Sequence, residues 1–392
     1  MLPGSASGGR TGACEPVMRW LTMAFALLLA ACGGQQTATP TFIAEGNPPI
    51  LSDWGMMVSD GRSLTLSEGV LAYDLNTPLF SDYAHKQRTI WMPDGVTATY
   101  REGDVLDFPV GTVITKTFYY PRGDAADEVR LTTATATGWR PDGLDLSDIR
   151  LVETRILVHR ESGWIALPYV WNEDQTEAVL QRAGDLQHLI LVSEDGSRQA
   201  LPYAVPNANQ CAGCHAINNT TRQIQPIGPA ARHINREYAY ATGAQNQLTA
   251  MVEAGYLEDH PALDAAPQAA VYTDLSAPLD DRARSYLDIN CAHCHNPVGP
   301  ADTSGLHLNA DAPVGPNLGL CKLPIAAGGG TGGRRFSIQP GQPDESILVY
   351  RMEINDPGSM MPELGRSVRH EEGIALITDW IAQMEARCHQ AG

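Results

Sequence analysis

The chain has 392 residues and a formal net charge of −18, from 27 Lys and Arg against 45 Asp and Glu. This length has room for two or three domains, each able to bury its own core. The acidic residues are spread along the chain, and such a surface repels nucleic acid, so nucleic-acid binding is excluded as a function. The charge alone does not decide between steering a basic redox partner and plain solubility.

The N-terminal region predicts export. Arg19 precedes an apolar run over residues 21–30 that is too short to span a bilayer as a stable helix. A basic residue, a short apolar core and small residues before a cleavage site make a secretory signal. We therefore expect a signal peptide over 1–31, with Met18 as the start of translation.

The segment that ends at Cys32 resembles the lipobox of bacterial lipoproteins. The resemblance implies a lipidated Cys32, followed by a flexible tether over 32–49, in a periplasmic protein anchored to the outer membrane. Gly33 favours the outer membrane because it is not the aspartate associated with inner-membrane retention. The alternative is an ordinary signal peptide with an incidental cysteine.

Residues 50–205 have the composition of β-structure. Segments rich in β-branched and aromatic residues are separated by turn clusters, at 111–120, 151–159, 164–171 and 188–192. We expect a sandwich or a small barrel. After Cys211 the apolar spacing becomes helical, and helices are predicted over 246–257, 280–290 and 371–387.

Two CxxCH motifs carry the chemistry, Cys211-Ala212-Gly213-Cys214-His215 and Cys291-Ala292-His293-Cys294-His295. Two cysteines three positions apart on a helical turn reach both vinyl groups of a haem, and the next histidine lies beneath the iron. Zinc ribbons separate their cysteine pairs by about 15–20 residues, whereas 76 residues lie between Cys214 and Cys291. We therefore predict two covalently attached haem c groups, with His215 and His295 as iron ligands.

The segment after the second motif contains Met360-Met361-Pro362, followed by the predicted last helix. From residue 277 to 388 the sequence resembles the class I cytochrome c fold, in which a methionine before a proline is the second axial ligand. The resemblance implies that Met361 binds the iron above His295, with Met360 as the alternative; both could instead be core residues. The predicted fold class is multidomain, a mainly-β sandwich or barrel over 50–205 followed by α-helical cytochrome c-like haem modules over 206–275 and 276–392.

The sixth ligand of the first haem stays open at this point. The stretch from Gln225 to Pro229 resembles the proline-containing loop that covers the proximal histidine in cytochromes c, but no Met-Pro pair follows it. The candidates are His233, Met251 and His260, or an open position. The β region also resembles the β-sheet c-type cytochromes that oxidise hydroxylamine, which would put Lys116 beside a five-coordinate haem.

Taken whole, the chain resembles a group of bacterial di-haem cytochrome lipoproteins, through the residues around both CxxCH motifs. The resemblance implies electron relay between periplasmic redox proteins. The alternatives are a haem enzyme with an open first haem, acting on peroxide or a small nitrogen compound, and a binding module built on the β region. A glycine-rich stretch over 327–335 lacks the ending of a phosphate loop, so we expect no nucleotide. Whether Cys321 and Cys388 pair is left open.

Overall fold

A six-stranded antiparallel sheet with the order β11-β10-β9-β5-β4-β3 forms the centre of the strand-rich part. Its strands are β3 (Leu71–Tyr73), β4 (His85–Trp91), β5 (Val113–Pro121), β9 (Ile149–Arg160), β10 (Gly163–Trp171) and β11 (Ala178–Leu180). Because side chains alternate along a strand, the sheet buries both faces. Ile156 and Val158 pack into one core, and Leu157 between them packs into another.

Two smaller sheets and a hairpin complete the β-structure. The sheets have the orders β1-β2-β8-β7 and β13-β12-β6. Their strands are β1 (Met57–Ser59), β2 (Ser63–Leu66), β6 (Glu128–Arg130), β7 (Trp139–Arg140), β8 (Gly143–Asp145), β12 (Asp185–Val192) and β13 (Arg198–Val205), and the hairpin is β14 (Glu237–Tyr240) with β15 (Gly243–Asn246).

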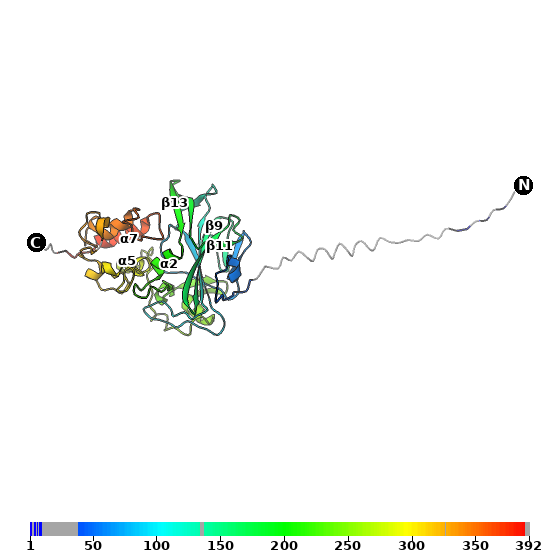
Figure 1. Cartoon of the computed structure of the whole chain (residues 1–392), viewed down its shortest axis with the longest axis horizontal. Helices are drawn as coiled ribbons and strands as arrows, with labels where there is room; N and C mark the ends of the chain where they lie inside the picture. Colours follow the sequence, from blue (N-terminus) through cyan, green and yellow to red (C-terminus); the bar gives the residue numbers. More distant parts are fainter. Residues whose placement is uncertain are drawn as a thin grey trace. The chain divides into compact units, whose positions relative to one another are not determined.

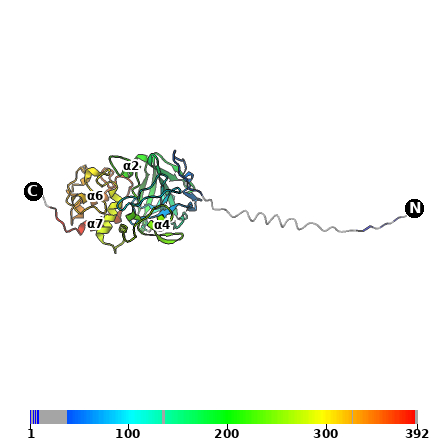
Figure 2. The ribbon, with the colours of Figure 1, turned by 90° about the horizontal axis from the view of Figure 1, so that it is seen from below.

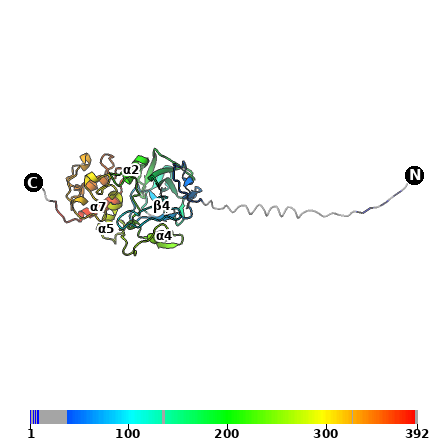
Figure 3. The same cartoon turned by 60° about the horizontal axis from the view of Figure 1, so that its bottom comes forward.

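The helices are short and lie mostly in the second half of the chain. They are α2 (Ala208–His215), α3 (Ala231–Ile234), α4 (Gln247–Glu253), α5 (Leu279–Leu287), α6 (Ile347–Glu353) and α7 (Glu371–Ala382). Further single turns are the 3-10 turns η1 (Leu51–Trp54), η3 (Asp302–Ser304), η4 (Pro316–Leu318), η5 (Gly328–Thr331) and η6 (Pro343–Glu345), and the π-helical turn η2 (Asp288–Ala292). In Figure 1, α5 and α7 lie on one side and the long strands on the other, with α2 between them. Figures 2 and 3 show the same placement of α2, with α4 on the strand side.

The predicted fold class is wrong, because the chain is mainly β, with 27% strand and 20% helix, and is not a set of helical cytochrome modules. The segment predicted as the first haem module has no core of its own, since Ile234, Leu248 and Met251 share one with Ile114 of the sheet. The physical reason lies in the 37 glycines and 27 prolines of the sequence, which interrupt helices. The helix predicted over 246–257, for example, ends at Glu253, before Gly255 with a φ of 74°.

The helix predicted over 371–387 forms as α7, and its apolar stripe packs where we expected. Ile377, Trp380 and Ile381 lie in one core with Tyr286 and Leu287 of α5. Asp280 near the start of α5 also accepts a hydrogen bond from Trp380 Nε1 at 2.7 Å. The two helices therefore fix the direction from which the chain enters the second CxxCH motif.

The computed structural model describes residues 1, 4, 6, 8, 9, 38–133, 137–325 and 327–388. The predicted start at Met18 and the predicted lipid anchor at Cys32 lie outside these residues. The described residues from 38 onward form one unit by their mutual contacts. Within the described ranges, no helix has the length and apolar character needed to cross a membrane.

Candidate functional site

The first CxxCH motif lies on α2, an eight-residue helix that depends on its cap. Asn207 accepts a hydrogen bond from Gln210 N at 2.9 Å, while Gln210 Oε1 accepts from Asn207 N at 2.9 Å. This reciprocal capping box satisfies two amide groups that a short helix leaves free. It fixes the turn on which Cys211 and Cys214 are three positions apart.

His215, the last residue of α2, has the protonation state and the tautomer that an iron ligand needs. Its Nδ1 lies 2.8 Å from the carbonyl oxygen of Gln225, and because a carbonyl only accepts, Nδ1 carries the proton. Burial, reinforced by the positive charge of Lys116, lowers the pKa of His215 to about 4. The imidazole is therefore neutral, and its Nε2 lone pair is free to bind a metal.

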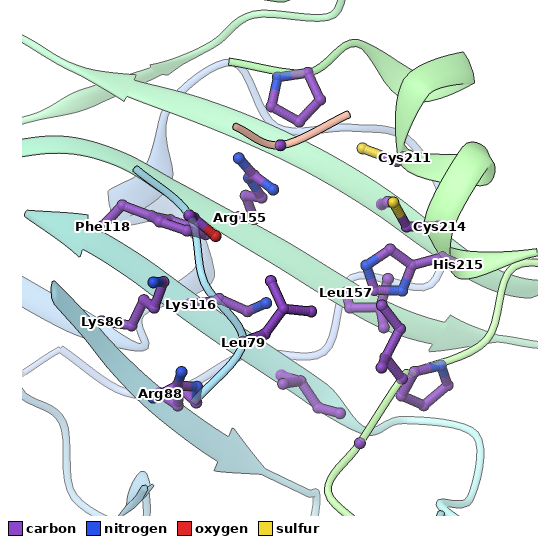
Figure 4. A pocket seen from close by; sticks show the side chains of 18 of the residues that line it. Leu79, Lys86, Arg88, Lys116, Phe118, Arg155, Leu157, Cys211, Cys214 and His215 are labelled. Atoms are coloured by element: carbon purple, nitrogen blue, oxygen red, sulfur yellow. The ribbon is translucent and has the colours of Figure 1, made fainter. Parts of the chain in front are cut away.

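A cavity adjoins this motif. Its enclosed volume is about 180 Å³, and it extends between Cys211, Cys214 and His215 on one side and the six-stranded sheet on the other (Figure 4). Ligand sites are commonly about 300–1,000 Å³. The enclosed part is smaller than that range, so a haem attached here would also occupy the open mouth of the cavity. Its wall is mostly apolar, but it also includes Lys86, Arg88, Lys116 and Arg155.

The second motif follows α5 through η2, so that Cys291 lies within a π-helical turn. Such turns occur often at functional sites. Ser304 Oγ donates to Ala301 O at 2.7 Å and lies 3.1 Å from His295 Nδ1. The serine proton is already used, so Nδ1–H of His295 is the donor, and Nε2 is again left free. Burial, with the charges of His293 and Arg351, lowers the pKa of His295 to about 4.

The Met-Pro loop is connected to the second motif through Arg351 and the charge of Glu363. Met361 N donates to Arg351 O at 2.8 Å, and the same Arg351 is close enough to His295 to lower its pKa. Glu363, two positions after Met361, is close enough to Cys294 to raise the pKa of that thiol. Arg366 holds the loop, with its Nε donating to Met361 O at 3.0 Å. Met361 is half-buried, whereas Met360 is buried in the protein.

The two motifs contact each other. Cys294 Sγ lies 3.8 Å from Gly213 O, and a hydrogen bond from Cys294 lowers the pKa of the Cys214 thiol. His293, from the second motif, lines the cavity of the first, and its buried Nδ1 has no partner among the described residues. The predicted attachment residues are therefore brought together at one junction rather than held in separate modules.

No family model, no curated protein and no solved structure matches the chain. Within the described ranges, no group of three or more His, Cys, Asp or Glu side chains could hold a bare metal ion.

None of the three candidates for the sixth ligand of the first haem lines the cavity. His233 uses both ring nitrogens, since Nε2 lies 3.1 Å from Asp288 Oδ2 and Nδ1 accepts from Ala230 N at 3.4 Å. Met251 is buried in a hydrophobic core. His260 lies 3.3 Å from Thr249 Oγ1 and 2.6 Å from Pro261 O. Lys116, by contrast, does line the cavity.

The cysteines of the described residues form two groups, one disulfide pair and the four cysteines of the CxxCH motifs. Cys321 and Cys388, 67 residues apart, form a disulfide with a Cα–Cα distance of 5.3 Å. The four free cysteines of the described residues are those of the two motifs. The pairing that the sequence left open is therefore present in the structure, and no motif cysteine takes part in it.

Sequence reasoning missed the other cations of the cavity, Lys86, Arg88 and Arg155. A signal for the first two was present, because Lys86 and Arg88 alternate along a strand and so share one face. The pairing of that strand with β5 could not be derived from one sequence.

Proposed function

We propose that this chain is an exported c-type cytochrome that carries two covalently attached haems and relays electrons between periplasmic redox proteins. The observation that carries the proposal is the presence of two CxxCH motifs whose histidines are both neutral and both hydrogen-bonded through Nδ1. Haem bound at these histidines supplies reversible one-electron chemistry at iron.

The residues present fit the group. Cys211, Cys214 and His215 border a cavity that opens to solvent, with basic side chains in its wall for two carboxylates. Gln225 and Ser304 orient the imidazoles and set their tautomers. Met361 would complete the iron at His295, and His/Met ligation raises the reduction potential. The contact between Cys294 and Gly213 favours electron transfer between the haems, because it keeps the attachment points together.

Export is part of the proposal, with Cys32 as a lipid anchor in the outer membrane. The Cys321–Cys388 disulfide supports it, since disulfides persist in oxidising compartments. The Cys32→Ala variant should be recovered from the soluble periplasmic fraction, whereas the unchanged chain should stay with outer membranes.

The test is a redox titration of the mature protein with optical detection. Two one-electron haem transitions are expected, with full reduction by ascorbate and no change of the reduced spectrum under carbon monoxide. A protein without redox-active haem would overturn the proposal.

A second candidate is supported by the cavity itself. None of the predicted ligands His233, Met251 and His260 borders it, while His293 does. An open position on the first iron would make the chain an enzyme acting on peroxide or a small nitrogen compound. High-spin oxidised haem, carbon monoxide binding at the first haem only, and turnover of such a substrate would select this candidate over electron relay.

A further inference from the structure

Three cationic residues lie in one row across the sheet. In the strand register, Arg88 of β4 is directly opposite Lys116 of β5, and Lys116 is directly opposite Arg155 of β9. The preceding row on the same face is apolar, Ile90, Ile114 and Leu157. Like charges directly opposite each other destabilise a sheet. The row therefore needs negatively charged or aromatic groups nearby to offset its charge.

The two arginines have such compensation within the protein. Arg88 Nη1 lies 2.8 Å from Asp74 Oδ1, and Arg155 Nε donates to Glu153 Oε2 at 2.9 Å. Glu153 is fully buried and also accepts from Tyr203 OH at 2.7 Å. Both carboxylates are thus committed to the arginines.

The two lysines of the cavity have no such direct partner. Across the described ranges, neither Lys86 nor Lys116 makes an ion pair or a hydrogen bond. Their ammonium groups lie 5.8 and 5.6 Å from the centre of the Phe118 ring, a ring that Arg155 already covers at 4.4 Å. Asp82 attracts Lys86, but its Oδ1 accepts from Ser367 N at 2.6 Å and Val368 N at 2.9 Å. One shared aromatic ring cannot offset two desolvated charges. Burial accordingly lowers the pKa of Lys86 well below its usual value and that of Lys116 to about 7. A bound anion would favour the charged form of both.

Lysine is rare in this chain and is concentrated at this cavity. The whole sequence contains three lysines, and two of them line this cavity. Figure 4 shows Lys86 and Lys116 rising from neighbouring strands, across the cavity from Cys214 and His215. Unpaired ammonium groups facing a cavity are a means of binding an anion.

We propose that Lys86 and Lys116 form an anion-binding site in the wall of this cavity, for a carboxylate or a small inorganic oxyanion. Two sources share this chemistry: the propionate groups of the haem attached at Cys211 and Cys214, and a free anion such as nitrite. The first source rests on the function proposed above, whereas the second does not.

The experiment compares the mature protein with its Lys86→Met, Lys116→Met and Lys116→Arg variants, and with Lys322→Met as the matched control outside the cavity. Nitrite and sulfate are titrated at low ionic strength while the melting temperature and the haem spectrum are recorded. If the anion is free, the unchanged protein and Lys322→Met respond saturably, and either cavity Lys→Met variant weakens the affinity about tenfold or more. Lys116→Arg retains the response because the charge remains.

If the anion is a haem propionate, added anions have no saturable effect. Lys86→Met and Lys116→Met then lower the reduction potential of the first haem, because positive charge beside it favours the reduced state. The proposal is overturned when both variants match Lys322→Met in anion response and in potential. A mature protein without haem would refute the proposed function alone, since the melting-temperature titration reads the anion site without haem.

Discussion

The sulfur of Cys294 lies 3.8 Å from the carbonyl oxygen of Gly213, although the two residues are 81 positions apart in the chain. Gly213 lies between the cysteines of the first motif, and Cys294 is the second cysteine of the other. A Cβ atom at Gly213 would meet Leu364 Cδ1 of the Met-Pro loop at 2.9 Å. A side chain at position 213 would therefore have to move the exposed end of Leu364.

A larger side chain at position 213 should disturb the second site through the first. In Gly213→Leu the side chain must displace the end of Leu364, which shares its loop with Met361. Because Leu364 is 39% exposed and can turn away, the stability cost should be about 0.5 kcal/mol or less. We expect a nearly unchanged melting temperature and a change of the methionine-ligation band in the oxidised optical spectrum. Gly103→Leu is the control, since no atom lies within 4 Å of a Cβ there. Equal behaviour of the two variants would contradict this account of the junction.

Alanine substitutions at the two adjacent methionines should distinguish an iron ligand from a core residue. Met361→Ala should lower the reduction potential of the haem at His295 with a modest effect on stability, because this side chain is half-buried. Met360→Ala should keep the potential but cost about 2–4 kcal/mol, since Met360 is buried with 8% exposure. Potentiometry and thermal unfolding test both. The reverse pattern would assign the ligand to Met360.

Asp288 should be a main stabilising contact between the segment after the first motif and the helix that leads to the second. Its carboxylate binds Arg232 Nε at 2.8 Å and His233 Nε2 at 3.1 Å, and accepts from Ala310 N at 3.1 Å. Asp288→Asn leaves Arg232 without its partner, and we expect a loss of about 3–5 kcal/mol. The exposed pair of Arg101 and Asp107 is the control, where Asp107→Asn should cost about 1 kcal/mol or less.

The same contact predicts a pH dependence. The hydrogen bond from His233 and the charge of Arg232 outweigh burial and lower the pKa of Asp288 below its usual value. A carboxyl with a lowered folded pKa adds stability above its unfolded pKa of about 4 and loses it progressively as the pH falls further. Urea unfolding between pH 6 and pH 3 should therefore show a steeper acid loss for the unchanged protein than for Asp288→Asn. Parallel curves would contradict the contribution of Asp288.

His233 should be a structural residue and not an iron ligand. His233→Ala removes a buried hydrogen bond to Asp288, which we expect to cost about 1–3 kcal/mol. The optical and paramagnetic-resonance spectra of the first haem should be unchanged, because both ring nitrogens are occupied elsewhere. A spectral change confined to the first haem would return His233 to the ligand candidates.

The sequence predicted local features better than their assembly. The strand predicted over 111–120 is present as β5, Val113–Pro121, and the predicted apolar stripe of α7 is also present. The helical haem modules were wrong because α4 and its neighbours are short, and their apolar residues complete the core of the sheet. Propensity over a few residues does not specify which surface a short helix will cover.

The candidate site also has features that the sequence predicts and features that it does not. The CxxCH motifs and the Met-Pro loop are visible as patterns, and the structure places them together. The row formed by Arg88, Lys116 and Arg155 depends on the register of three strands, with 38 residues between Lys116 and Arg155. Strand register across such separations is fixed by the packing of whole faces, which a single sequence does not display.

The most direct test of the central claim is the intact mass of protein matured in a periplasm with functioning haem-attachment machinery. The account predicts the mass of the processed chain plus two haems. It also predicts one haem each for the variants in which Cys211 and Cys214, or Cys291 and Cys294, are replaced by alanine. A mature mass without bound porphyrin, or one unchanged by either pair of substitutions, would contradict it.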